Sequence, residues 1–262
     1  MGLEYLIMAH KQQMEFFESV FDAFKNFIES PNFLGVVDLG SHDTSGGPHT
    51  LLPVGTRYVG VDLCAGDNVN VISPIELVDL PSASFSIAIS SEVLEHNPFW
   101  RETLFQLCRL SSPGGLVVWT CAGIGRREHG TSRSDGGITA PFVIQLGREY
   151  YKNIAAYDAE FSFDHSLWFS SCKYFENFES RDTYFVGLRI GKSEIDTAAF
   201  ESLINGLTPK YVTNRTLRSY LHSLPSENYL AWYFKILQVK NRIKRFLVEK
   251  GKIKKIARRF KG

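Results

Sequence analysis

Short, uninterrupted apolar runs alternate with amphipathic stretches through the middle of the chain. Four runs rich in β-branched residues, 34–39, 57–62, 85–90 and 116–120, are typical of parallel strands that are covered on both faces. A stretch with helical spacing, 101–110, separates the last two. This rhythm predicts a doubly wound α/β fold, in which helices cover both faces of a mostly parallel sheet.

Both ends of this α/β region carry further elements. Residues 4–29 repeat phenylalanines and other apolar side chains at helical spacing, which predicts an amphipathic helix that ends at Ser30. Its aromatic stripe fits either a packed helix face or the wall of a pocket. Residues 174–178 and 183–190 predict a terminal strand hairpin. The segment 123–147, rich in glycine, serine and charge, predicts a long functional loop.

Composition sets the scale and excludes several classes of protein. The 262 residues are 44% hydrophobic, which suits one large core with appendages and is too apolar for a disordered chain. The four cysteines form no C-x-x-C pair, so they suggest neither a disulfide framework nor a zinc cluster, and we expect no metal-binding residues. The chain shows no apolar run long enough for a transmembrane helix and no signal-peptide pattern, so we expect a cytoplasmic protein.

The net charge of +1 hides a strong asymmetry. Residues 231–262 carry 12 Lys or Arg and one acid, Glu249, whereas the rest of the chain has 17 basic and 27 acidic residues. Apolar positions recur at helical spacing in this tail, which predicts a basic amphipathic helix. An anionic membrane surface is the leading partner, which would make the protein peripheral on the inner membrane surface. Pairing with another chain, nucleic acid as a weaker candidate, and no specific partner stay open.

The first predicted strand runs directly into a turn of small residues. Residues 36–47 read VVDLGSHDTSGG, with Asp38 before the turn and Gly40 within it, and glycine allows a tight turn beneath a ligand. The next strand ends on Asp62, 24 residues after Asp38. An acid at this distance suits the ribose hydroxyls of a nucleoside. The pattern predicts a nucleoside cofactor at the switch point of the sheet.

Two later segments indicate which cofactor this is. Residues 84–96 read SFSIAISSEVLEH and residues 110–118 read LSSPGGLVV. Together with the glycine turn and Asp62, they resemble the class I S-adenosylmethionine-dependent methyltransferases, in the branch of methyltransferase type 11. The resemblance covers about residues 34–120 and continues more weakly to about 190. It implies a Rossmann-like, seven-stranded, mostly parallel sheet with an antiparallel final hairpin, and S-adenosyl-L-methionine as the cofactor.

The resemblance also implies a set of cofactor-binding residues, although the chain departs from the family pattern. The first motif commonly repeats glycine where this chain has His42 and Thr44. In the family an acid faces the adenine amine; the corresponding position in this chain is near Ser73, and no acid stands there. We expect the hydroxyl or backbone of Ser73 to take its place. The expected cofactor-binding residues are Asp38, Gly40, Ser41, Asp62, Leu63, Ser73, Ser91 and Glu92.

Candidate groups on the acceptor side follow the third and fourth strands. Glu92 and His96 are four residues apart and share one face if that segment is helical. Histidine titrates near neutrality, so His96 and His129 are candidate bases. The alternative interpretation is that Glu95-His96 braces the loop by hydrogen bonds. The expected catalytic residues are Glu92, His96 and His129.

The loop TCAGIGRREHGTSRS, 120–134, is dense in groups that bind polar or anionic ligands. It fits an acceptor-binding loop or a solvated charged loop. The expected acceptor-binding residues are Arg126, Arg127, Glu128 and Tyr151.

The predicted organisation has four parts: an N-terminal helix (1–30), a methyltransferase domain (31–192), a helical extension (193–230) and the basic tail (231–262). The leading functional hypothesis is O-methylation of a sugar or glycolipid intermediate. A methyltransferase acting on small molecules of secondary metabolism is one alternative. A non-catalytic binding protein with a methyltransferase fold, recruited through its tail, is another.

Overall fold

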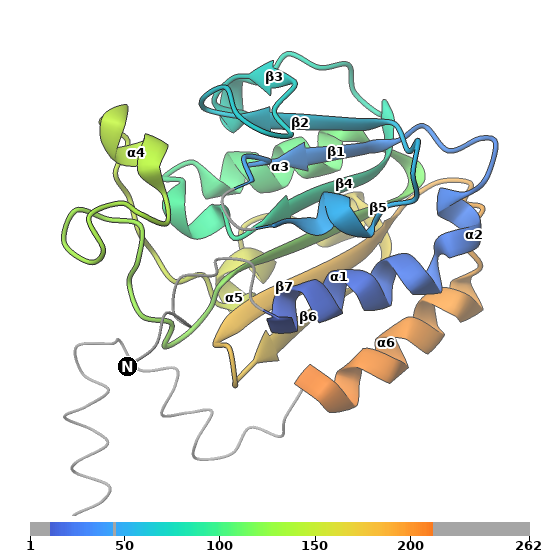
Figure 1. The fold of residues 1–262 in the computed structure, drawn as a ribbon. Helices are drawn as coiled ribbons and strands as arrows, with labels where there is room; N and C mark the ends of the chain where they lie inside the picture. The colour runs from blue at the N-terminus through green and yellow to red at the C-terminus, as the bar shows by residue number, and fades with distance from the viewer. Residues whose placement is uncertain (1–10, 44–45, 212–262) are drawn as a thin grey trace, which may run out of the picture. The chain divides into compact units, whose positions relative to one another are not determined.

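The computed structural model describes residues 11–43 and 46–211, which belong to one compact unit. They form a seven-stranded sheet with helices on both faces (Figure 1). The basic tail 231–262 lies outside the described residues, and helix α6 (Thr197–Tyr211) is the described part of the expected helical extension.

The strand order is β3-β2-β1-β4-β5-β7-β6. Strand β7 runs antiparallel to both of its neighbours, and the other pairs are parallel. The strands are β1 (Val36–Leu39), β2 (Tyr58–Asp62), β3 (Val71–Ile72), β4 (Phe85–Ser91), β5 (Ser111–Ala122), β6 (Phe169–Asn177) and β7 (Asp182–Arg189). The other helices are α1 (Lys11–Ala23), α2 (Lys25–Ile28), α3 (Trp100–Leu110), α4 (Pro141–Gln145) and α5 (Ala156–Glu160), with 3-10 helices η1 (Pro48–Leu51), η2 (Ile75–Leu77), η3 (Leu94–His96) and η4 (His165–Leu167).

The predicted α/β class, the four parallel strands and the terminal hairpin are confirmed. Strand β5 is longer than predicted because Ser111 already pairs with Phe85; the register then shifts across the Pro-Gly-Gly segment, where Gly114 has a φ of +74°, before Leu116 pairs with Ile87. Strand β3 was not predicted from the sequence, because it has two residues, too few to form an apolar run, and Ile72 is exposed.

One face of the sheet is covered by α1 and α6 (Figure 1). Phe16 and Phe17 of α1 are fully buried, and the Phe16 ring stacks on Tyr184 of β7 with 4.7 Å between ring centroids. Phe24 stacks on Phe200 of α6 at 6.1 Å. The aromatic stripe is therefore a packed helix face. The single N-terminal helix predicted for this region is wrong in one respect, since it breaks at Phe24 between α1 and α2.

Helix α3 covers the opposite face of the sheet. Apolar residues three and four apart along α3, including Trp100, Leu104 and Leu107, are buried against β4 and β5, where they meet Phe85 and Trp119. Because helices bury both faces, polar groups gather where the strands end. The parallel strands all end at one edge, and that edge carries the site.

Candidate functional site

A cavity opens at the carboxyl edge of the sheet, beside the switch point between β1 and β4. Turns that follow β1, β2 and β4 line it, and residues 139–143 at the start of α4 complete the wall. Seven of the eight expected cofactor-binding residues line this cavity: Asp38, Gly40, Ser41, Asp62, Leu63, Ser91 and Glu92.

Gly40 makes the turn after β1 possible. Its φ of +93° lies in the left-handed region, which glycine adopts without a steric penalty. A Cβ atom at this position would lie 2.1 Å from Cγ2 of Val93, which follows β4. The turn after β1 therefore packs directly against the turn after β4, and only glycine fits between them.

Asp38 is a buried acid with one unsatisfied oxygen. The Tyr58 hydroxyl donates a 2.7 Å hydrogen bond to its Oδ2, whereas Oδ1 has no partner within the described part of the chain. Burial raises the pKa of Asp38 to about 7, against the opposing effect of the Tyr58 hydrogen bond. This carboxyl is thus suited to a ligand group that donates hydrogen bonds and carries positive charge.

Asp62 is held in one orientation by the backbone. The amide of His42 donates to its Oδ2 at 3.0 Å, and the amide of Leu63 donates to its Oδ1 at 2.7 Å. Burial raises the pKa of Asp62, and these backbone hydrogen bonds oppose the rise. Each carboxylate oxygen can accept a second hydrogen bond, so the group can receive two neighbouring hydroxyls.

Ser73, the eighth expected cofactor-binding residue, does not line the cavity. Its hydroxyl donates to the carbonyl of Pro74 at 2.9 Å. Glu76 of η2 lines the cavity instead, with Oε1 paired to Arg148 and a buried Oε2 that has no partner among residues 11–43 and 46–211. An acid is therefore present three residues after the position where the sequence alignment places it.

Glu92 follows β4 in a strained backbone conformation, with a φ of +54°. The two-residue step from Glu92 into η3 is not helical, so Glu92 and His96 do not share a helix face as the sequence suggested. Both residues nevertheless line the cavity. The Glu92 carboxyl is buried with neither oxygen hydrogen-bonded at normal geometry to a described residue, and burial raises its pKa well above the usual range.

Arg126 is held by β7 and by the turn that precedes it. Its guanidinium donates to Oδ1 of Asp182 at 3.0 Å and to the carbonyl of Ser180 at 2.8 Å, and it does not line the cavity. Burial raises the pKa of Asp182 to about 6, and Arg126 opposes that rise. Arg126 therefore forms an internal ion pair with Asp182 that ties the loop to β7. These hydrogen bonds occupy donors of the guanidinium that an acceptor molecule would otherwise use.

Of the remaining expected acceptor-binding residues, Arg127 and Glu128 lie in the same loop as Arg126, and Tyr151 lies further along the chain. Arg127 is exposed, and its carbonyl accepts a hydrogen bond from the Tyr151 hydroxyl at 3.0 Å. Glu128 pairs with Arg133 at 2.8 Å. Neither Arg127, Glu128 nor Tyr151 lines the cavity, so contact with an acceptor would require it to extend beyond the cavity mouth.

His96 and His129 come together although 33 positions separate them in the sequence. Their ring centroids lie 4.9 Å apart, and the Tyr151 ring lies 5.5 Å from that of His96. Burial lowers the pKa of His96 to about 3, so its imidazole is neutral at physiological pH. His129 also has a lowered pKa because of burial.

Two residues that line the cavity lie outside the strand motifs and were not singled out from the sequence. Gln13 of α1 donates a hydrogen bond to the Ser91 hydroxyl, and the Phe142 ring of α4 packs edge-on against His42 at 4.7 Å. Gln13 is the polar residue on the otherwise apolar, buried face of α1. A lone polar residue on such a face is the signal that sequence reasoning missed.

Comparison with known proteins finds no matching family model and no matching curated protein. Among solved structures, the chain is similar to the CurJ carbon methyltransferase, with 14% sequence identity and a TM-score of 0.44. The match covers 66% of this chain and 54% of that one. It therefore spans about half of that protein. The Burkholderia thailandensis 1,6-didemethyltoxoflavin-N1-methyltransferase is similar at 12% identity over 70% of this chain and 80% of that one, with a TM-score of 0.46. The N-terminal domain of EvdMO1 is similar at 16% identity over 69% and 84%, with a TM-score of 0.43.

The strand order decides the fold. Five strands pair in parallel in the order 3-2-1-4-5, and β7 is inserted antiparallel between β5 and β6. This is the arrangement that the sequence resemblance implies. The chain has the class I methyltransferase fold. In this fold the cavity lies at the switch point, where the turns after β1, β2 and β4 meet.

Proposed function

We propose that this protein is an S-adenosylmethionine-dependent methyltransferase. The observation that carries the proposal is the cavity at the switch point, lined by Asp38, the Gly40 turn and Asp62. The hydrogen-bond acceptors there fit the cofactor. It offers an ammonium group, two ribose hydroxyls and an adenine amine, and all of these donate hydrogen bonds. The cavity offers the carboxyls of Asp38, Asp62 and Glu76.

Each carboxyl has a distinct role in this proposal. Asp62, oriented by two backbone amides, accepts the ribose hydroxyls. Asp38 accepts the ammonium group through its free Oδ1, and Glu76 accepts the adenine amine through its free Oε2. Ser91, whose hydroxyl is held by Gln13, lies between these groups and the acceptor side.

The bound cofactor supplies a methyl group that is electrophilic because it is attached to a sulfonium. The chain must then align an acceptor, exclude water and remove the acceptor's proton. Glu92 is the best placed candidate base, because it lines the cavity and its burial raises its pKa well above the usual range of a carboxyl. His96 also lines the cavity, but its low pKa makes it a weak base.

For the acceptor, we propose a hydroxyl of a sugar or glycolipid intermediate. The resemblance of the motifs and the polar loop beyond the cavity support this choice, since Arg127, Ser132 and Arg133 are exposed there. A compact small molecule of secondary metabolism is the alternative. The packing of Phe142 on His42 favours it, because an aromatic wall at the cavity suits a planar ligand.

Calorimetry on the full chain tests cofactor binding. We expect S-adenosylmethionine and S-adenosylhomocysteine to bind, and Asp62→Ala to weaken binding by about 1.5–3 kcal/mol, because hydrogen bonds to a charged group are lost. Asp79→Ala is the matched control, since Asp79 is an exposed acid outside the cavity. Equal affinities for wild type and Asp62→Ala would contradict the assignment. Binding with no methyl transfer to any acceptor would favour a non-catalytic binding protein.

A further inference from the structure

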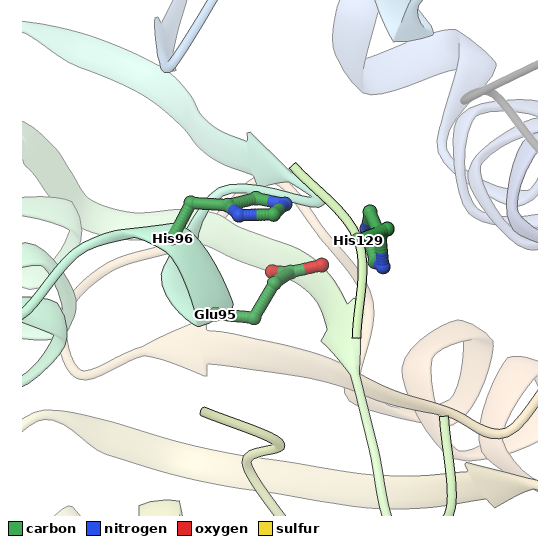
Figure 2. A group of neighbouring side chains, drawn as sticks. All are labelled: Glu95, His96 and His129. Atoms are coloured by element: carbon green, nitrogen blue, oxygen red, sulfur yellow. The ribbon is translucent and has the colours of Figure 1, made fainter. Parts of the chain in front are cut away.

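Three side chains with metal-binding groups converge beside the cavity. Glu95 and His96 lie in η3, directly after β4, and His129 lies in the loop that follows β5 (Figure 2). One ligand atom from each lies within 4.8 Å of the other two. Because β4 and β5 are neighbours in the sheet, the loops at their ends place these residues together.

The polar atoms of this cluster lack partners. Glu95 is fully buried, and its Oε1 accepts a 3.0 Å hydrogen bond from the amide of Ala122, which fixes the carboxyl in place. Its Oε2 has no partner, and neither ring nitrogen of His96 makes a hydrogen bond of normal geometry, within the residues that the structure describes. A loop brace accounts for Oε1 alone. Three buried polar atoms without partners are costly unless something binds them.

The electrostatics of the surroundings favour a cation. The carboxyls of Glu92, Glu95 and Asp182 are close enough to interact electrostatically with one another. Each of them also interacts with the guanidinium of Arg126. Arg126 is already paired with Asp182. When ionised, three carboxylates around one guanidinium leave an excess negative charge that a divalent ion would neutralise.

We propose that Glu95, His96 and His129 bind a divalent transition-metal ion of the zinc class. Two imidazoles and a carboxylate form the donor set of several catalytic zinc sites, and the same set with open positions binds ferrous iron. Magnesium and calcium prefer sites made of oxygen ligands alone. With bonds of about 2.1 Å, tetrahedral ligands lie about 3.4 Å apart. The ligand atoms lie within 4.8 Å of one another, so side-chain rotations that bring them to about 3.4 Å would complete the site.

The position of the site gives it a use. His96 lines the cavity, so an ion held there would border the acceptor side. If the protein is a methyltransferase as proposed, the ion's open positions would hold an acceptor oxygen and favour loss of its proton. This role rests on the proposed function, whereas metal binding itself does not. An acceptor with two adjacent oxygens, such as a sugar diol, suits such a site.

Zinc titration of the full chain, after removal of metals with a chelator, tests the proposal. We expect about one Zn²⁺ per chain, with Glu95→Gln and His129→Ala each weakening binding by at least about tenfold, in the range seen when metal-site residues are altered. Glu95→Gln keeps an oxygen to accept from the Ala122 amide, so the fold should persist. His165→Gln is the matched control, since His165 lies in η4 and packs on Phe163.

Cobalt gives a second measurement on wild-type protein that needs no variant. Co²⁺ should show the visible bands of a site with four or five ligands, without the charge-transfer band of a cysteine thiolate. No zinc binding, a thiolate band, or unchanged affinity in both variants would overturn the proposal. Calorimetry with S-adenosylhomocysteine on the metal-free protein separates the two proposals. Zinc binding without cofactor binding would refute the proposed function and leave the metal site standing.

Discussion

At the scale of single residues, the cavity is defined by acids that are buried before any ligand arrives. Asp38, Glu76 and Glu92 each keep at least one carboxyl oxygen without a partner among the described residues. Such oxygens cost stability in the free protein and become favourable when a ligand donates to them. Ligand binding and protonation at this cavity are therefore coupled.

The raised pKa of Asp38 predicts how cofactor affinity depends on pH. Burial raises this pKa to about 7, so the carboxyl is largely neutral below pH 7 and ionised above it. An ammonium group favours the ionised form, so binding at lower pH must release a proton. We expect S-adenosylhomocysteine affinity to rise by up to about tenfold per pH unit from pH 5.5 to 6.5 and to level off near pH 7.5. Calorimetry in buffers of different ionisation enthalpy measures both the affinity and the proton release.

Asp38→Asn is the control for this pH dependence. The amide oxygen can still accept from the Tyr58 hydroxyl, so the variant should fold. It should bind more weakly at pH 7.5 and lose most of the slope, because the titrating group is gone. A slope that survives unchanged in Asp38→Asn would assign the titration to another group.

Adjacent arginines offer a second residue-scale prediction, because their surroundings differ. Arg126 is mostly buried and pairs with the fully buried Asp182 carboxylate, whereas Arg127 is exposed. Arg126→Ala should lower the free energy of unfolding by about 3–5 kcal/mol, since it strands a buried charge. Arg127→Ala should change it by no more than about 0.5 kcal/mol. Urea denaturation of the two variants checks this, and similar losses in both would show that the ion pair is not what stabilises the loop.

At the scale of elements, the site is made where turns pack against each other. The turn after β1 reaches Val93 after β4 because Gly40 has no side chain. The ends of β1 and β4, which are far apart in sequence, are thus held together by a close contact between Gly40 and Val93. This packing should be more sensitive to added volume than the outer loops are.

Two glycine variants separate steric conflict from backbone strain. Both Gly40 and Gly55 have positive φ, but a Cβ on Gly55 meets nothing within 4 Å, whereas one on Gly40 meets Val93 at 2.1 Å. Gly40→Ala should therefore cost about 1–3 kcal/mol more than Gly55→Ala and should abolish cofactor binding. Thermal and urea unfolding, with calorimetry on the cofactor, measure both effects. Equal destabilisation would mean that Val93 moves aside.

The elements also show how far the sequence could lead. Long apolar runs predicted β1, β2, β4, β5 and the hairpin, because strands buried on both faces leave a strong pattern. An acid for the adenine side was sought near Ser73, whereas the acid that lines the cavity in this segment is Glu76, since η2 turns the chain there and no apolar pattern marks so short a helix. The role of Arg126 could not be predicted, because its partner Asp182 is 56 residues away and only the sheet brings them together.

At the scale of the whole molecule, the described chain and the basic tail pose separate questions. None of the helices in residues 11–43 and 46–211 is long and apolar enough to cross a bilayer. The tail 231–262 lies outside the described residues, and its proposed docking on an anionic membrane surface rests on sequence alone. That surface partner is a proposal that vesicle binding can test.

Vesicle sedimentation tests the tail. The intact protein should bind vesicles of anionic lipid and be largely released at high salt, because salt screens the Lys and Arg charges. Removal of 231–262 takes away a charge of +11 and should abolish binding while cofactor affinity is kept, since every cavity residue precedes it. If the intact protein ignores anionic vesicles at low salt, the membrane interpretation is wrong. A change of oligomeric state on truncation would instead indicate pairing of the tail.

The packing of α1 has a consequence for how the protein is made. Phe16 meets Tyr184, and Phe24 meets Phe200, so the first described helix finds its partners about 170 residues later. At about 5–20 residues per second, a ribosome takes roughly 8–35 s to supply them. Throughout that interval the aromatic face of α1 lacks the partners that β7 and α6 supply. Chaperone capture of this helix during translation would protect the chain until β7 and α6 emerge.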